Sequence, residues 1–239
     1  MIKNIIFDLG GVLLDIDLIH CMKQIQALGV DMDAFSANTS HHPLHDDTKP
    51  AVMGEGIVAN GVVNLYQVGG ITTEDFLACV QQACHPGTTR QQVLDAWNTC
   101  CIGIPQYRLD KVKELRERGY HLYMLSNTND AHWQDIVQRC FGGEDVVNGL
   151  FEHVFLSQEM HLAKPNEDIY LKVLEDTHAK AEECLFIDDS TPNVEAAAAL
   201  GFRTIHADVS ATRDGKVVAP PATDWPKTID LQLATLANG

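Results

Sequence analysis

Residues 3–17, KNIIFDLGGVLLDID, decide the fold of this chain. The short apolar run of residues 5–7 ends at Asp8, and a glycine pair follows at residues 10–11. A run of this kind is typical of a buried strand that stops at a tight turn. The pattern predicts a strand over residues 4–8 with a carboxylate at its carboxyl end. It also raises the question of what Gly10, which has no side chain, contributes two residues further on.

Apolar runs and helical patterns alternate regularly from residue 108 onward. The predicted strands cover residues 120–127, 153–157, 184–189 and 202–207, and the predicted helices cover residues 108–119, 130–141, 166–177 and 191–201. We expect Thr191 to cap the last of these helices and Gly201 to close it. Strands that alternate with helices form a parallel sheet with helices on both faces. The sequence therefore predicts an α/β fold, a Rossmann-like doubly wound sheet that the strand at residues 4–8 joins.

Residues 15–105 differ from the rest, because helical patterns dominate and no clear strand is visible. Thr72 and Asp75 have the spacing of a capping box. We expect a discontinuous core of residues 1–14 and 106–239, with a small all-α cap domain of residues 15–105 inserted after the first strand. A closing helix is expected near the carboxyl terminus, at residues 227–238.

Composition restricts the partners. The 239 residues carry a formal net charge of -16, which disfavours nucleic acid and anionic membranes. The seven cysteines, an odd number without C-x-x-C spacing, fit reduced thiols in a cytoplasmic protein. Neither a signal peptide nor a membrane-spanning run is expected.

Polar residues with chemical potential fall at the ends of the predicted strands. Ligands of open parallel sheets bind at the carboxyl ends of the strands, so we expect these residues to converge there. They are Asp8, Ser126, Asn127, Lys164, Asp188 and Asp189.

Three carboxylates in one place repel each other unless a cation joins them, and Mg²⁺ favours oxygen ligands. With Asp8 and Asp189 as ligands, the ion would also attract a phosphate group. Asp8 could then attack phosphorus, and Lys164 would neutralise charge. The Ser126 hydroxyl and the Asn127 backbone N–H would donate hydrogen bonds to a phosphoryl oxygen.

Four motifs resemble those of the haloacid dehalogenase (HAD) superfamily over residues 1–207. They are FDLGGVL (7–13), LSNTN (125–129), AKPNEDIY (163–170) and FIDDSTPNVEAA (186–197). In detail the set is similar to bacterial sugar-phosphate phosphatases with a helical cap, including those acting on alpha-glucose-1-phosphate. The resemblance implies a HAD-like core, Asp8 as nucleophile and Lys164 as its charge partner. It also implies a phosphate-binding turn at Ser126 and Asn127, and Mg²⁺ bound by Asp8, the Gly10 carbonyl, Asp189 and, directly or through water, Asp188.

The departure from the family pattern is Gly10, because most phosphatases of this family carry an acid/base Asp at that position. Three outcomes stay open: another acid replaces it, solvent serves, or turnover is lost. The candidate replacements are Asp15, Asp17, His41, His42 and His45. The look-alike sugar-phosphatases share the glycine, which favours the first two outcomes. The three histidines fit a loop better than a metal site, because Pro43 interrupts them.

The sequence thus predicts a Mg²⁺-dependent phosphatase, a monomer or homodimer, acting on a small phosphorylated metabolite such as a sugar phosphate. One alternative is a metal-free 2-haloacid dehalogenase, suggested by Lys164 followed by Tyr170 and opposed by the acidic pair at 188–189. Another is a non-catalytic phosphoryl-binding protein, suggested by Gly10. Trp97 and Tyr66 fit the core of the insert better than a sugar-stacking surface.

Overall fold

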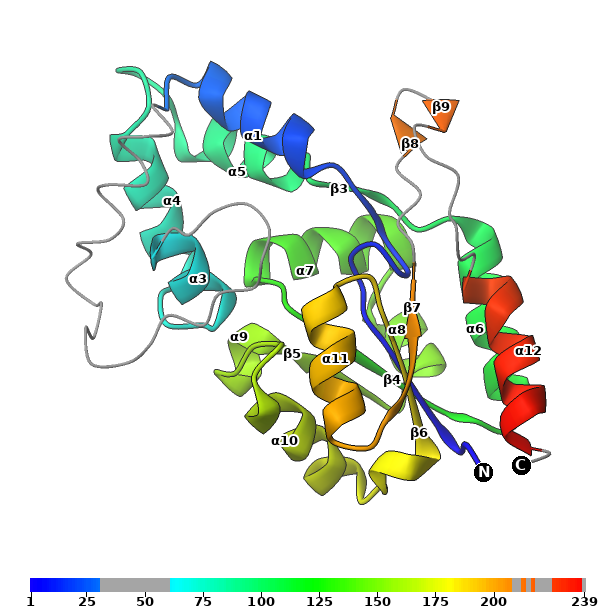
Figure 1. The fold of residues 1–239 in the computed structure, drawn as a ribbon. Coiled ribbons are helices and arrows are strands. Elements are labelled where there is room, and N and C mark those ends of the chain that lie inside the picture. The colour runs from blue at the N-terminus through cyan, green and yellow to red at the C-terminus, as the bar shows by residue number, and fades with distance from the viewer. Residues whose placement is uncertain (31–60, 208–211, 214–215, 218–224, 238–239) are drawn as a thin grey trace.

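A five-stranded parallel sheet forms the centre of the protein (Figure 1). The computed structural model describes residues 1–30, 61–207, 212–213, 216–217 and 225–237, so the loop with His41, His42 and His45 lies outside the described residues. The strand order is β5-β4-β1-β6-β7. The strands are β1 (Asn4–Phe7), β4 (His121–Ser126), β5 (His153–Leu156), β6 (Cys184–Asp188) and β7 (Arg203–His206).

Strand β1 is the middle strand because its residues are apolar on both faces. Ile5 and Phe7 point into one core cluster and Ile6 into the other. The same alternation holds in β4, where Met124 and Leu125 belong to opposite clusters. A strand that is buried on both faces reads as a continuous apolar run, which is why the pattern around residue 5 identified it.

Helices cover both faces of the sheet, as predicted. One face carries α6 (Gln106–Glu117), α7 (Asp130–Ile136), α8 (Glu144–Leu150) and α12 (Trp225–Ala237). The other carries α10 (Glu167–Thr177) and α11 (Thr191–Ala199), which lie side by side in Figure 1. The α/β, doubly wound fold class is therefore confirmed.

Among the described residues, four helices lie between β1 and α6 in the sequence, and they gather at one end of the molecule (Figure 1). They are α1 (Leu18–Ala27), α3 (Gly61–Gln67), α4 (Thr73–Gln82) and α5 (Arg90–Asn98). The capping box at the start of α4 is confirmed, because the Thr72 and Asp75 side chains bond each other's backbone.

The expectation of no strand in this insert was wrong. Its two ends pair as a short antiparallel ladder, β2 (Asp15–Ile16) with β3 (Cys101–Gly103). Arg139 supports this ladder by donating hydrogen bonds to the carbonyls of Cys101 and Ile102. The two segments are too short to show a strand period, and their pairing follows from the fold.

Several element boundaries also differ from the prediction. The cap of α11 is Ser190, without a side-chain bond, and Thr191 is the first residue of the helix. The helix predicted over 130–141 is α7 followed by a short π-helix, η1 (Val137–Phe141). Not predicted were α8, a four-residue helix α9 (Ser157–Met160), a 3-10 turn η2 (Ala181–Glu183) and a small ladder of β8 (Thr212–Arg213) and β9 (Lys216–Val217).

The carboxyl-terminal helix α12 closes one face of the core. Its Trp225 indole donates a 2.9 Å hydrogen bond to the Val12 carbonyl and packs edge-on against Phe7, with ring centres 5.2 Å apart. This contact ties the helix to the loop after β1. Among the described helices, none has the length and apolar character needed to cross a bilayer.

Candidate active site

The strand ends place the predicted residues together. Asp8 directly follows β1, Ser126 ends β4 and Asp188 ends β6. Because β1 pairs with both β4 and β6, these ends are neighbours at the carboxyl edge of the sheet. Carboxylate oxygens of Asp8, Asp188 and Asp189 lie within 4.8 Å of one another.

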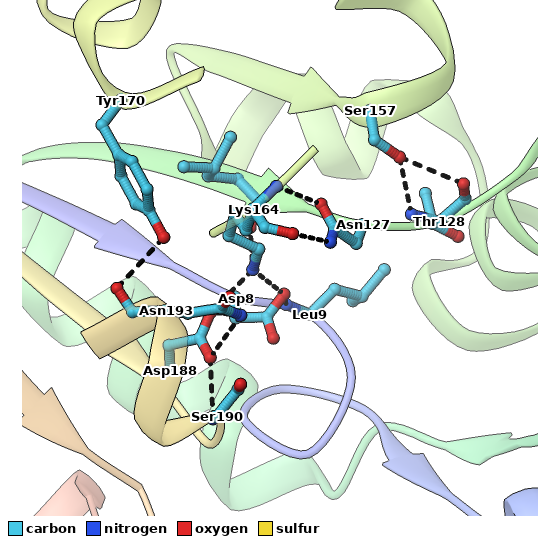
Figure 2. A network of polar contacts seen from close by, with 11 residues as sticks. Asp8, Leu9, Asn127, Thr128, Ser157, Lys164, Tyr170, Asp188, Ser190 and Asn193 are labelled. Carbon is cyan, nitrogen blue, oxygen red and sulfur yellow. Dashed lines mark hydrogen bonds and ion pairs between the residues drawn. The ribbon is translucent and has the colours of Figure 1, made fainter. Parts of the chain in front are cut away.

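Lys164 lies at the centre of this cluster (Figure 2). Its ammonium nitrogen is 2.8 Å from Asp8 Oδ1 and 2.7 Å from Asp188 Oδ2, and it donates a hydrogen bond to the Leu125 carbonyl. Only 2% of the lysine side chain is exposed, so these two ion pairs are shielded from water. The lysine therefore joins the ends of β1, β4 and β6 into one charged unit.

Side chains not assigned a role from the sequence hold Asp188 in place. The Asn193 amide donates to both carboxylate oxygens, and the Ser190 backbone N–H donates to Oδ1 at 2.8 Å. Tyr170 in turn donates its hydroxyl to the Asn193 carbonyl at 3.0 Å (Figure 2). Asn193 could have been found from its place in the first turn after an acidic strand end. Tyr170 was singled out from the sequence only for the dehalogenase alternative, and its bond to Asn193 was not predicted.

Asn127 acts through its side chain as well as its position in the turn. Its amide group exchanges two hydrogen bonds with the Lys164 backbone, at 2.9 and 3.0 Å. This pair fixes the loop that delivers Lys164 to the site. The next residue, Thr128, is held by a 3.0 Å bond from its N–H to the Ser157 hydroxyl.

Burial and the neighbouring charges shift the pKa values of the groups in the site. Burial raises the pKa of the Asp8 carboxyl to about 8; the Lys164 ammonium opposes the rise, and Asp188 and Asp189 add to it. Burial and the adjacent Asp188 also raise the pKa of Asp189 to about 6. Burial would lower the pKa of Lys164, but Asp188 and Asp8 outweigh it and raise that pKa above its usual value.

One ammonium group beside three carboxylates leaves the site with an excess of negative charge when all are ionised, and a divalent cation would neutralise it. Mg²⁺ holds oxygen ligands at about 2.1 Å, so ligands on opposite sides of the ion are about 4.2 Å apart. The observed separations, up to 4.8 Å, need only a small adjustment. The three acidic residues therefore fit a divalent cation.

The glycine pair gives the loop after β1 room to pass the acids. Gly11 has φ of 75°, and a Cβ at that residue would collide with the Asp189 carboxylate. At Gly10 the conditions are different, because a Cβ would meet only the Ile16 side chain, at an ordinary 3.6 Å. The site therefore requires a glycine at 11 and tolerates a side chain at 10.

Two of the proposed replacements for the missing acid/base are occupied elsewhere. Asp15 forms a 2.8 Å ion pair with the buried Arg108 guanidinium. Asp17 caps α1 by accepting a 2.9 Å hydrogen bond from the His20 N–H. Neither Asp15 nor Asp17 is thus poised to serve as the acid.

A cavity of about 320 Å³ opens between the site and the helical insert. On the core side its wall includes Gly10, Ser126, Asn127 and Lys164. On the other side it is bordered by residues of α3 and α5, among them Asn64, Gln67 and Trp97.

Of the two aromatic residues singled out in the insert, Tyr66 is confirmed as a core residue. Its ring stacks on Phe76, with centres 4.5 Å apart, and its hydroxyl accepts a 2.9 Å bond from the Ala131 N–H. Trp97 is half-buried, packs against the same core and also borders the cavity.

The acidic cluster and the buried lysine lie at the switch point of a doubly wound sheet, where α/β enzymes of this architecture bind their ligands. The fold and the site together therefore indicate an α/β enzyme of the hydrolase type.

Comparison with known proteins identifies the family. The model of the haloacid dehalogenase-like hydrolases matches residues 2–201, so the chain belongs to this family. The resemblance found from the four motifs and the assignment as a hydrolase are thereby confirmed.

The chain is 27% identical over 212 residues to a D-ribitol-5-phosphate phosphatase of Bacteroides thetaiotaomicron, covering 88% of this chain and 94% of the relative. A HAD family enzyme from the same organism, solved in complex with magnesium and inorganic phosphate, is 31% identical. It superposes with a TM-score of 0.73, over 90% of this chain and 98% of that one. A predicted HAD-like hydrolase from Porphyromonas gingivalis is 29% identical, with a TM-score of 0.71 over 98% of both chains.

Proposed function

We propose that the protein is a Mg²⁺-dependent phosphatase that hydrolyses a small phosphorylated metabolite of the sugar-phosphate class through an aspartyl-phosphate on Asp8. The observation that carries this proposal is the unit of Asp8, Lys164, Asp188 and Asp189, whose lysine also lines the cavity between the core and the helical insert. The similarity to a ribitol-phosphate phosphatase and to a structure with bound magnesium and phosphate supports it.

Asp8 is oriented for attack by two donors on the same oxygen. Oδ1 accepts the Leu9 N–H at 2.7 Å and lies 2.8 Å from the Lys164 ammonium. Both contacts are made to Oδ1 and neither to Oδ2. We therefore assign Oδ2 as the attacking oxygen. Attack on phosphorus forms the acyl phosphate and releases the alcohol, and water then hydrolyses the acyl phosphate.

Asp8, Asp189 and the Gly10 carbonyl would hold the ion, while Asp188 would act through water because its oxygens already accept bonds from Lys164, Asn193 and Ser190. When bound, Mg²⁺ supplies positive charge that lowers the pKa of Asp8 and stabilises the phosphoryl oxygens. Lys164 supplies the second positive charge, and Ser126 with the Asn127 N–H completes the phosphate cradle.

The insert of residues 15–105 would act as a cap over the core of residues 1–14 and 106–239, excluding water and selecting the leaving group. With Gly10 in place of an acid/base, and with Asp15 and Asp17 engaged elsewhere, we propose that solvent protonates the leaving oxygen. A positioned acid contributes about 10²–10⁴ in rate, so a slow enzyme is expected.

The test is a phosphatase screen over sugar phosphates, nucleotides and acyl phosphates, with and without Mg²⁺. Mg²⁺-dependent release of phosphate that Asp8→Asn abolishes supports the proposal. Release that persists without Mg²⁺, or near wild-type activity of Asp8→Asn, contradicts it. Dehalogenation of a 2-haloacid without metal would favour the alternative enzyme, although Tyr170 already donates its hydroxyl to Asn193.

A further inference from the structure

An apolar chamber adjoins the active-site cavity inside the helical insert. Its volume is about 80 Å³. Among the described residues, those that line the chamber but not the larger cavity come from α1 and α4 and are Cys21, Met22, Ile25, Phe76 and Val80. The residues that border both spaces are Leu18, Val63, Trp97, Cys100 and His132. The chamber is therefore a side compartment of the site.

The polar atoms in the shared wall are already paired. The His132 Nε2–H donates to the Trp97 carbonyl at 3.0 Å, and His132 Nδ1 accepts from the Asn129 amide at 3.1 Å. The Trp97 indole N–H in turn donates to Asn129 Oδ1, at 3.4 Å. The His132 ring stacks on Trp97 with centres 4.9 Å apart, so the two present ring surfaces and no free hydrogen-bonding group.

Among the described residues that line the chamber, the other polar side-chain atoms are sulfur atoms of cysteine and methionine, which bond weakly. Cys21 is buried, and its thiol donates to the Trp97 carbonyl at 3.3 Å. A hydroxyl group that entered this chamber would lose its bonds to water and gain no equivalent partner from these residues. A hydrocarbon group would lose nothing of this kind.

We propose that this chamber binds a short alkyl end of the leaving group, so that the substrate class is the phosphate monoester of an alcohol with a hydrocarbon end. The inference rests on the phosphatase function proposed above and goes beyond its sugar-phosphate class, because it adds an unhydroxylated end to the substrate. The segment next to the phosphate can still be polar, because the larger cavity offers Asn64 and Gln67 from α3. A fully hydroxylated sugar alcohol would fit the larger cavity and leave the chamber empty.

The size of the chamber limits the alkyl group. An apolar cavity of about 150 Å³ binds benzene. By proportion, a chamber of about 80 Å³ holds about three carbon atoms. We therefore expect a short aliphatic end to fit and an aromatic ring to be excluded.

The test measures kcat/KM with Mg²⁺ for n-alkyl phosphates from ethyl to octyl and for the monophosphates of the matching terminal diols, with acetyl phosphate as a reference. We expect kcat/KM to rise about fourfold per methylene over about three methylenes, and then to stop rising. Each diol monophosphate should be at least about tenfold poorer than the alkyl phosphate of equal length.

Two variants that fill the chamber provide a second readout. Val80→Phe and Met22→Phe should lower the ratio of kcat/KM for the best alkyl phosphate over ethyl phosphate at least about tenfold. Lys23→Phe adds the same ring to an exposed residue of α1 and should keep the ratio. The ratio is insensitive to a general loss of activity. Because Met22 is half-buried, Met22→Phe provides the test if Val80→Phe does not fold.

The outcomes separate the two proposals. Hydrolysis of acetyl phosphate shows that the phosphatase function stands. The alkyl chamber is then refuted by any one of three results: chain length has no effect on kcat/KM, the diol monophosphates are equal or better substrates, or both filled variants keep the wild-type ratio. If no substrate, acetyl phosphate included, is hydrolysed with Mg²⁺, the phosphatase function fails and the chamber assignment fails with it.

Discussion

Replacing Lys164 with Met should destabilise the protein strongly, because the lysine is the ammonium group paired with two buried carboxylates. Its nitrogen lies 2.8 Å from Asp8 and 2.7 Å from Asp188, whose side chain is fully buried. Breaking a buried ion pair from one side typically costs about 3–5 kcal/mol, since the remaining charge stays uncompensated. We expect Lys164→Met to lower the free energy of unfolding by this amount and to abolish phosphatase activity.

The size of the effect should depend on the carboxylate left behind. Asp188→Asn removes one of the carboxylates that Lys164→Met leaves without a partner. The double variant Lys164→Met/Asp188→Asn should therefore be more stable than the sum of the two single effects predicts, by about 1–3 kcal/mol. Urea unfolding of the four proteins at pH 7.5, in EDTA, measures this coupling. Because the measurement uses no metal and no substrate, it isolates the lysine–carboxylate unit.

An exposed ion pair of the same chain serves as the control. Lys3 lies 2.6 Å from Glu183, but 58% of its side chain is exposed. Lys3→Met should therefore lower the free energy of unfolding by less than about 1 kcal/mol. A loss below 1 kcal/mol for Lys164→Met as well, or strictly additive effects with Asp188→Asn, would refute the view that Lys164 compensates buried charge.

Three further predictions concern other parts of the molecule. Gly10→Asp should raise kcat with Mg²⁺ at least about tenfold, because the backbone at residue 10 has space for a side chain and a positioned acid contributes about 10²–10⁴; an unchanged or lower kcat would contradict it. Burial lowers the pKa of His132 from 6.5 to about 4. Between these two pH values the unfolded chain binds a proton at His132 that the folded protein does not, so the free energy of unfolding falls as the pH drops from 6.5 to about 4. Between pH 7 and pH 4 the wild type should lose up to about 3 kcal/mol more than His132→Gln in urea unfolding, and equal losses would disprove this. Tyr66→Phe removes the acceptor of the buried Ala131 N–H and should lower the free energy of unfolding by about 1–3 kcal/mol, whereas a neutral effect would show that another group satisfies this N–H.

The sequence was sufficient for the sheet because its strands are short apolar runs that end in polar residues. The run at residues 4–7 and the run at residues 184–188 each stop at an acid, and parallel pairing then brings the two acids together. The same logic correctly placed Lys164 beside both acids and Ser126 in the wall of the adjoining cavity. Hydrophobic periodicity and the positions of the strand ends thus predict where most of the candidate site residues lie.

The features that were missed depend on contacts between distant residues. The ladder of β2 and β3 joins segments about 85 residues apart, and two or three residues have no readable period. The bonds from Asn193 to Asp188, and from the Asn127 amide to the Lys164 backbone, follow from loop geometry that no local pattern specifies. The apolar chamber likewise forms only when α1 and α4 both pack against α5.

Some expectations remain predictions. They include a monomeric or homodimeric state, a cytoplasmic location, the boundaries of the cap domain and the metal contact of the Gly10 carbonyl. The roles suggested for His41, His42 and His45 lie outside the described residues.

The most direct test of the central claim is to trap the phosphoryl group on the enzyme. The wild-type protein would be mixed with acetyl phosphate and Mg²⁺, quenched in acid during turnover and digested for mass spectrometry. Because Gly10 supplies no base for the second step, the intermediate should accumulate, and we predict phosphorylation of the peptide that contains Asp8 and none in Asp8→Asn. Turnover with no phosphorylated peptide, or phosphorylation at another residue that persists in Asp8→Asn, would contradict the account.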